Sequence, residues 1–339
     1  MSYSGNALLV QATSLLGSVL PPLWTASLVH GPQPTMTVTT PSGKQPQWWL
    51  HARQHLYPKQ ALEESFLRSA TARPIVVAPF LSRETQERLK SVDVDYIDLT
   101  GNVSLNHIDP DLFVSRTGAT RAPTPELREQ SLKGEKAASV LLELLHRALP
   151  AGVREIAARS KATPGYVSKL LAALDERALL SRNDKGQVTQ VDRWRLLQAW
   201  ATDSPVMKRC QAYSCIEPRG LPSLLSKLPK LNQRWAITGS LAAQTKAPVA
   251  PPRLAMIYVE QIAEAATVLG LQPADTGYNV LLLSAPTSLP FDRAWTHQGL
   301  QYADLYLVIV DLLTSPGRSP AEAEALWNWI QQGDGSARG

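Results

Sequence analysis

One stretch of the sequence, Val153–Val191, decides how the middle of the chain folds: VREIAARSKATPGYVSKLLAALDERALLSRNDKGQVTQV. Its first eight residues predict a short helix over Val153–Ser160, and the turn that follows begins at Lys161. Thr163 is a good helix N-cap. Pro164 fits the first position of a further helix, where its missing N–H costs nothing.

This further helix is predicted to run from Pro164 to about Leu179. Four apolar residues recur at the spacing of one helical face: Val167, Leu170, Leu171 and Leu174. Burial of that face turns the start of the helix outward, because the residues between the apolar positions lie on the opposite side. The residues expected to face outward are Gly165, Tyr166, Ser168 and Lys169.

The flanking segments complete a recognisable unit. Lys133–Leu149 predicts an amphipathic helix before the stretch. The end of the stretch and the three residues that follow it, Ser181–Trp194, predict a β-hairpin, because Asn183–Gly186 is a tight-turn sequence between two short extended pieces. Three helices followed by a hairpin predict a winged helix-turn-helix domain over residues 131–200.

The charge of the chain is concentrated in the same window. The whole chain carries a formal net charge of +5, and Ser131–Arg195 holds twelve basic against seven acidic residues, the same excess of five. The rest of the chain is therefore balanced. A local excess of basic residues is the first sign of a nucleic-acid site.

The sequence therefore predicts binding to double-stranded DNA through this domain. The start of a recognition helix meets base edges, while hydroxyl groups and cations contact phosphate. Cations in the hairpin are expected to reach the backbone of an adjacent groove. The predicted DNA-binding residues are Arg154, Lys161, Thr163, Gly165, Tyr166, Ser168, Lys169, Arg182 and Lys185.

Segments on both sides of this window predict α/β domains. Residues 1–120 alternate strand and helix patterns: a helix ending near Pro21, strands at Thr35–Thr40, Gln47–Ala52, Pro74–Ala78, Val94–Leu99 and Val103–Leu105, and helices at Ala61–Ser69 and Arg83–Ser91, the latter capped by Ser82. Residues 207–332 offer strands at Arg234–Thr238, Leu254–Val259 and Asn279–Ser284, and helices at Gln261–Leu269 and Pro320–Ile330. Alternation of this kind is typical of α/β folds. Ala119–Glu126 is the predicted linker.

Composition narrows the class of protein. The chain has 339 residues, of which 44% are hydrophobic and 19% charged, which is ordinary for globular domains. Cys210 and Cys215 have no clustered partners that would complete a metal site. The apolar stretch Ala7–Val29 is interrupted by Gln11, Gly17 and a proline pair, so neither a signal peptide nor a membrane anchor is expected. We expect a cytoplasmic protein without cofactor or metal.

Three parts follow one another in the sequence: Arg73–Leu105 with its YIDLTGN, the predicted winged helix, and Arg234–Gln244 (RWAITGSLAAQ) together with Asp311–Trp329. Their order resembles the AbiEi-type family of bacterial winged-helix transcriptional regulators, the antitoxins of type IV toxin–antitoxin systems. This resemblance implies DNA binding and repression, with a toxin or defence protein as a partner. Two-fold operators often bind dimers, which suggests a homodimer.

The first domain also resembles a restriction-endonuclease-like fold whose active site is lost. Such nucleases need carboxylates for a metal and a lysine that helps to activate water. The matching strand, Leu50–Arg53, has histidine in place of the carboxylate and arginine in place of the lysine, and arginine stays protonated. Asp98, Gly101 and Asn102 are better explained as a turn fixed by side-chain hydrogen bonds.

The third domain resembles a nucleotidyltransferase at Gly239-Ser240, which follows a predicted strand. Those enzymes carry two acids on the next strand to hold magnesium. Here the next strand, Leu254–Val259, contains no acid before Glu260. Both α/β domains are therefore predicted to be catalytically degenerate.

Together these observations predict a sequence-specific DNA-binding regulator, acting as a repressor, and not an enzyme. One alternative is an antitoxin or defence component that works by binding protein, with weak DNA binding. Another is a metal-dependent nuclease or nucleotidyltransferase whose acids lie elsewhere in the sequence.

Overall fold

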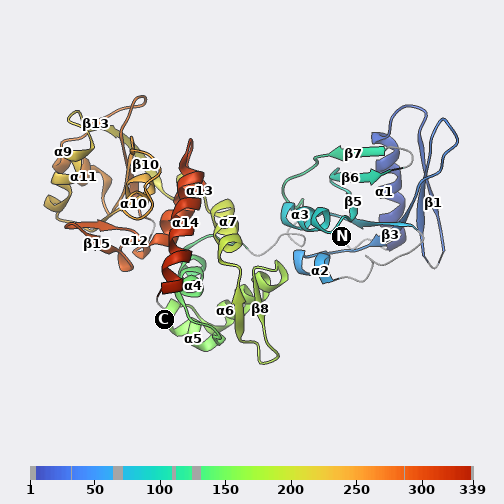
Figure 1. Ribbon diagram of the computed structural model, residues 1–339, viewed down its shortest axis with the longest axis horizontal. Helices are drawn as coiled ribbons and strands as arrows, with labels where there is room; N and C mark the ends of the chain where they lie inside the picture. Colours follow the sequence, from blue (N-terminus) through green and yellow to red (C-terminus); the bar gives the residue numbers. More distant parts are fainter. Residues whose placement is uncertain are drawn as a thin grey trace. The chain divides into compact units, whose positions relative to one another are not determined.

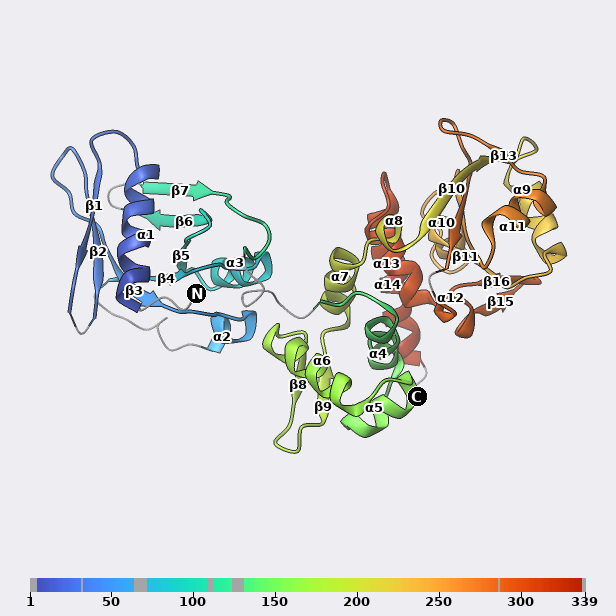
Figure 2. The ribbon, with the colours of Figure 1, turned by 180° about the vertical axis from the view of Figure 1, so that it is seen from behind.

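A computed structural model describes residues 5–31, 33–63, 72–108, 112–123, 131–285 and 287–336. Its contacts divide the chain into two compact units, Met1–Gln130 with Ala172–Ala178, and Ser131–Leu171 with Leu179–Gly339. Both combine helices with a sheet, so the fold is mixed α/β with an added helical part, as predicted. Figures 1 and 2 show the ribbon from opposite sides.

The first unit is built on a seven-stranded sheet whose strands follow one another in chain order. The three inner strands β3, β4 and β5 are parallel, and the neighbours on both sides are antiparallel. The elements are α1 (Gly5–Val19), β1 (Thr25–Val29), β2 (Thr35–Thr39), β3 (Gln47–Ala52), α2 (Pro58–Glu63), β4 (Arg73–Ala78), α3 (Arg83–Ser91), β5 (Asp95–Asp98), β6 (Val103–His107) and β7 (Leu112–Arg116).

Both faces of this sheet are covered by helices. Alternate residues of a strand point to opposite faces. In β4, Ile75 and Val77 pack in the core under α1, whereas Val76 and Ala78 pack in the core that includes residues of α2 and α3. A strand that is buried on both faces has a continuous apolar sequence. The prediction of a buried strand at Pro74–Ala78 is therefore confirmed.

Local signals predicted this unit well in its interior and poorly at its edges. Helix α3 has the predicted bounds, and the Ser82 side chain accepts a hydrogen bond from the Thr85 amide at 3.3 Å. The edge strands β1 and β7 were not predicted. The predicted helix over 61–69 overlaps α2, which ends at Glu63, and residues 64–69 lie outside the described residues.

The second unit begins with the helices of the DNA-binding prediction, of which α6 belongs to this unit as far as Leu171. These elements are α4 (Glu135–His146), α5 (Val153–Ser160), α6 (Pro164–Glu176), β8 (Leu180–Arg182), β9 (Val188–Val191) and α7 (Arg193–Asp203). Their shared core is apolar and buried, and it includes Val140, Leu144, Ile156, Val167, Leu170, Leu196 and Trp200. The predicted three helices and hairpin are therefore present in order.

Predicted boundaries differ from the structure at α4, at α6 and at the hairpin, and α4 also begins two residues later than predicted. Helix α4 ends at His146 rather than Leu149, because Pro150 disfavours helical geometry in the residue before it. Helix α6 ends at Glu176, and Ala178 adopts a left-handed φ of 54°. The hairpin was predicted to extend to Trp194. Its second strand ends at Val191, and the Asp192 side chain caps α7 by accepting from the Arg195 amide at 3.1 Å.

A second seven-stranded sheet follows, in the order β13-β10-β14-β12-β11-β16-β15. Three of its central strands were predicted to within one residue at each end. The elements are α8 (Val206–Arg209), β10 (Gln211–Ile216), α9 (Leu221–Lys227), the 3₁₀ helix η3 (Leu228–Lys230), β11 (Trp235–Thr238), α10 (Gly239–Ala243), β12 (Ala255–Val259), α11 (Ile262–Leu269), β13 (Gln272–Pro273), β14 (Val280–Ser284), α12 (Leu289–Asp292), β15 (Trp295–His297), β16 (Leu300–Tyr302), α13 (Leu305–Leu313) and α14 (Ser319–Ser336).

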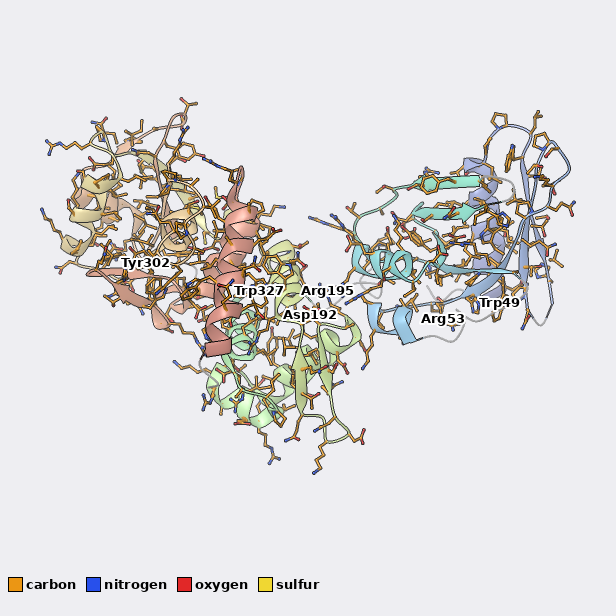
Figure 3. The ribbon with its side chains drawn as sticks, in the orientation of Figure 1. Trp49, Arg53, Asp192, Arg195, Tyr302 and Trp327 are labelled. Atoms are coloured by element: carbon orange, nitrogen blue, oxygen red, sulfur yellow. The ribbon has the colours of Figure 1, made fainter. Side chains whose placement is uncertain are left out.

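Helix α13 joins the helical part of this unit to the sheet. Its residues from Tyr306 to Leu312 are all buried, and it packs against α14, α10, β11, α7 and α4. Trp194 of α7 stacks on Trp327 of α14 with ring centroids 5.7 Å apart. Figure 3 labels Trp327, and it labels Asp192 and Arg195 at the start of α7. Within the described ranges, no helix combines the length and apolar character needed to cross a membrane.

Candidate nucleic-acid interface

The turn between α5 and α6 is fixed by local chemistry. Lys161 adopts a left-handed φ of 55°, which ends α5 and turns the chain. Thr163 then starts α6: its hydroxyl accepts a long hydrogen bond from the Tyr166 amide at 3.4 Å, and its carbonyl accepts from the Val167 amide at 3.0 Å. The predicted cap is confirmed.

The first turns of α6 expose the side chains that the sequence predicted. Val167 and Leu170 are completely buried, whereas Gly165, Ser168 and Lys169 are exposed. A Cβ added at Gly165 would meet no atom within 4 Å, so the space beside this residue is open. The start of α6 therefore offers a small, polar and cationic surface.

Tyr166 differs from its neighbours because it is half-buried. Burial raises the pKa of its phenol above the ordinary value of 10.0. The hydroxyl is therefore protonated at neutral pH and able to donate a hydrogen bond. The prediction of Tyr166 as an outward-facing residue is only partly met, because part of the ring packs against the protein.

The hairpin β8–β9 carries Arg182, which is half-buried, and Lys185, which is exposed at the turn. The turn is held by Asn183, whose side-chain oxygen accepts from the amides of Lys185 at 3.1 Å and Gln187 at 3.0 Å. Gly186 takes a φ of 73°, which a residue without Cβ adopts readily. Lys185 is thereby presented at the tip of the hairpin.

The sequence did not reveal a further extended residue beside the hairpin. Ala151, between α4 and α5, exchanges two backbone hydrogen bonds with Val188 of β9, at 3.0 and 2.9 Å. The hairpin is thus tied to the helices by backbone pairing as well as by side chains. A single extended residue has no periodicity, so no local pattern could have found it.

Pairing with acids removes part of the basic excess from the surface. Arg147 pairs with Glu143 at 3.0 Å and also with Glu155, while Arg159 lies 3.8 Å from Glu143. Four other exposed basic residues, at α5, the turn, α6 and the hairpin, have no acidic partner among the described residues: Arg154, Lys161, Lys169 and Lys185. The candidate interface is built around these four cations.

One buried carboxylate of the first unit, Asp95, has partners within the fold. Asp95 in β5 is buried and accepts from the Trp48 indole at 2.7 Å, from Arg73 Nε at 2.9 Å and from the Asn106 amide at 3.1 Å. Burial raises the pKa of this carboxyl, and the bonds from Trp48 and Arg73 oppose the rise. His51, which the sequence resemblance places opposite a nuclease carboxylate, lies in β3.

Asp98 fixes the turn that was predicted to be structural. It is completely buried and accepts hydrogen bonds from the amides of Leu81, Thr100 and Asn102 at 2.9–3.0 Å. The Asn102 side chain continues the network by accepting from the Gly118 amide at 2.8 Å. The structural interpretation of this motif is consistent with all of these contacts.

The Gly239-Ser240 pair of the second sheet also has structural partners. It opens the short helix α10 after β11, and the Ser240 hydroxyl donates to Glu322 at 2.5 Å. The neighbouring strand β12 is buried along its whole length and contains no acid. Among the described residues there is no cluster of three or more histidine, cysteine or acidic side chains that could hold a metal ion.

One polar cluster was not predicted. Asp311 of α13 is completely buried and accepts from Thr238 Oγ1 at 2.6 Å and Tyr258 Oη at 2.8 Å, and it pairs with Arg209. The available signal was a single acid within the apolar run Leu305–Leu313. Such an acid requires a buried partner, but the sequence does not say which cation supplies it.

Comparisons of the chain with known protein families, with curated proteins and with solved structures found no match.

Proposed function

We propose that residues 131–200 form a winged helix-turn-helix that binds double-stranded DNA, and that the chain is a sequence-specific transcriptional regulator, acting as a repressor. The α/β parts on either side would be a degenerate restriction-endonuclease-like domain over residues 1–120 and a degenerate nucleotidyltransferase-like domain over residues 207–332. The antitoxin role, a toxin partner and a homodimer remain predictions from the resemblance.

One observation carries the proposal. The buried stripe of α6 leaves Gly165, Ser168 and Lys169 exposed at the N-terminal turns, and the adjacent turn and hairpin expose Lys161 and Lys185 without acidic partners among the described residues. This is the arrangement in which a recognition helix enters the major groove with its N-terminal residues foremost.

The roles of the residues follow from their chemistry. Gly165 and Ser168 would lie against base edges, where a small residue allows close approach and a hydroxyl donates or accepts. Thr163, Tyr166 and Lys169 would contact phosphate and sugar, and Arg154 and Lys161 would add charge beside them. Arg182 and Lys185 would reach the phosphates of an adjacent groove from the hairpin.

Fluorescence anisotropy tests this function directly. The full chain is titrated against duplex DNA from upstream of its own gene and against a scrambled duplex, at two salt concentrations. Tight binding that prefers the upstream duplex and weakens with salt is the expected result, because phosphate contacts release counterions. Equal and weak binding to both duplexes would contradict sequence-specific recognition.

A charge reversal locates the interface. Lys169→Glu is expected to weaken binding by about tenfold or more, because a phosphate contact becomes a repulsion. Lys230→Glu is the matched control, since this exposed lysine lies in η3 and changes the net charge equally. A similar loss in both variants would show that the response reflects net charge and not this surface.

A further inference from the structure

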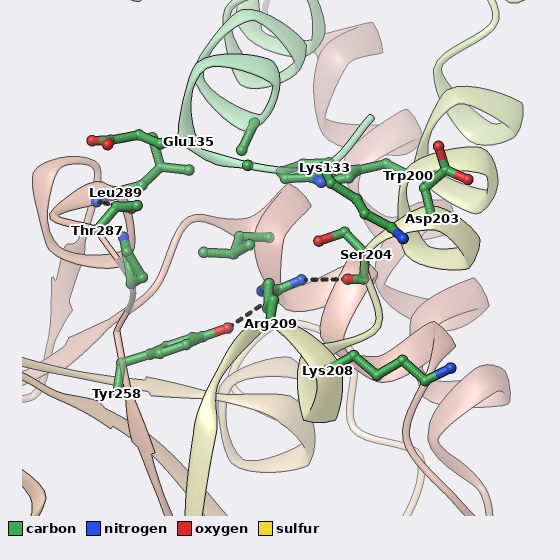
Figure 4. A pocket seen from close by; sticks show the side chains of 14 residues that line it. Lys133, Glu135, Trp200, Asp203, Ser204, Lys208, Arg209, Tyr258, Thr287 and Leu289 are labelled. Atoms are coloured by element: carbon green, nitrogen blue, oxygen red, sulfur yellow. Dashed lines mark hydrogen bonds between the residues drawn. The ribbon is translucent and has the colours of Figure 1, made fainter. Parts of the chain in front are cut away.

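A cavity of about 330 Å³ lies inside the second unit, between its helical part and its sheet. Its wall comes from the start of α4, from the end of α7 and the segment after it, from Tyr258 of β12, and from α12 and α13. Figure 4 shows the side chains that line it. Cavities of this size are typical of small-molecule sites.

Most of the wall is apolar. Trp200 of α7 and Leu307 of α13 contribute buried side chains, Leu289 and Pro290 come from α12, and the ring of Tyr258 borders the space. Contact with these groups would remove apolar ligand surface from water, which favours binding. The body of a suitable ligand is therefore apolar.

The polar groups of the wall include three cations. Arg209 is held in place, because its guanidinium donates to the Ser204 carbonyl at 3.0 Å and to Tyr258 Oη at 2.6 Å (Figure 4). It also pairs with Asp311. Lys133 and Lys208 are exposed and also line the cavity. One guanidinium with fixed partners and two exposed ammonium groups thus line the same apolar space.

The acids of the wall are fewer and one is already engaged. Asp203 accepts from the Leu132 amide at 2.9 Å. In Figure 4 the Glu135 carboxylate lies on the opposite side of the cavity from Arg209 and Lys208. Asp311 offsets the charge of Arg209. Lys133 and Lys208 are therefore the cations that remain for a ligand, and Glu135 lies across the cavity from them. The N-terminus of α4 at Gly134, which has no side-chain cap, adds positive potential.

We propose that this cavity binds a small organic anion, a molecule with one carboxylate or sulfonate on an apolar body. The apolar body would lie against Trp200, Leu289 and Leu307, and the anionic group would pair with Lys133 and Lys208. The site joins α4 and α7 to α12 and α13, so a bound ligand contacts both the helical part and the sheet part. Binding here does not depend on the proposed DNA binding.

The test uses anilinonaphthalene sulfonate, an anion with an apolar body whose fluorescence rises in apolar surroundings. It is added to the full chain in the absence of DNA. N-phenyl-naphthylamine is the matched neutral probe. We expect one saturable site for the anion and binding at least about fivefold weaker for the neutral probe, because it lacks the ion pairs with the lysines. Binding at several sites, no saturation, or equal affinity for both probes would overturn the proposal.

Variants assign the site to this cavity. The double variant Lys133→Gln with Lys208→Gln is expected to bind the anionic probe about fivefold more weakly and the neutral probe with unchanged affinity. The control variant Lys230→Gln with Arg253→Gln removes the same charge from exposed positions that do not line the cavity. It should change the affinity of neither probe. Ala138→Phe places a ring in the cavity and should reduce the binding of both. Equal effects of the two double variants on the anion would overturn the assignment, and circular dichroism of each variant verifies the fold.

Discussion

Arg293 donates a hydrogen bond to Glu143 at 2.9 Å, and the two residues are 150 positions apart. Glu143 lies in α4 with its side chain 5% exposed, and Arg293 directly follows α12. Arg147 holds the other oxygen of the same carboxylate at 3.0 Å. A buried carboxylate thus connects the first helix of the DNA-binding prediction to the C-terminal part of the second unit.

Glu143→Gln should destabilise the protein by about 2 kcal/mol, because removal of a buried charge leaves its partners desolvated and unpaired. This destabilisation is smaller than is usual for a broken buried ion pair, because Arg293 is one third exposed to water and Arg147 still pairs with Glu155. Urea unfolding measures the change. Glu324→Gln, at an exposed position in α14, is the control, and equal midpoints for the two variants would contradict a role for the buried pair.

Gly118→Ala should destabilise the first unit by at least about 2 kcal/mol. An added Cβ would lie 2.2 Å from the Thr100 carbonyl oxygen and 2.5 Å from the Gly101 carbonyl carbon, both backbone atoms of the turn that Asp98 fixes. Gly31→Ala is the control, because a Cβ there meets nothing within 4 Å. The measurement is thermal unfolding, and a wild-type transition in Gly118→Ala would show that the turn has room to move.

Interior elements of the fold could be predicted because their signals are local. Helices α3 and α5 have the predicted bounds, since a capping serine and helical spacing lie within the segments themselves. Edge strand β1 alternates exposed and half-buried residues and has few apolar contacts to reveal it. It is defined by its pairing with β2, which a local pattern does not contain.

The candidate interface shows the same division. Exposure of Gly165, Ser168 and Lys169 followed from the spacing of the buried residues in α6, and this prediction is confirmed. Which cations remain free of acids could not be predicted, because the buried carboxylate of Glu143 pairs with cations from several elements. Net charge in a sequence window cannot distinguish an exposed cation from one in a buried pair.

Both thiols should react slowly in the folded protein. Cys210 and Cys215 form no disulfide, and burial raises the pKa of each to about 11. At pH 8 the thiolate fraction should be about 100-fold lower than for a thiol of ordinary pKa, and only the thiolate is nucleophilic. Labelling with dithiobisnitrobenzoate measures the rate, with urea-unfolded protein as the control. A thiol that labels equally fast in both states would contradict this burial.

The same shifts predict how stability depends on pH. Each thiol has a folded pKa above its ordinary value of 9.0, so the folded state binds its proton more tightly than the unfolded state. This contribution is complete below pH 9 and is lost as the pH rises toward 11. The free energy of unfolding should therefore fall less steeply over this range in Cys215→Ala than in the wild type. Parallel pH curves from urea unfolding would exclude this contribution from Cys215.

Lys185→Gln separates a phosphate contact from a contribution to folding. Lys185 is exposed at the hairpin tip, and the turn is held by the Asn183 side chain and the φ of Gly186, so the substitution should leave the unfolding midpoint unchanged. If the hairpin reaches DNA, the slope of log affinity against log salt should become shallower by about 1, as one counterion fewer is released. Anisotropy at four salt concentrations measures the slope, with Lys230→Gln as the matched control. An unchanged slope with binding otherwise intact would place the hairpin away from the phosphates and restrict the interface to α5, the turn and α6.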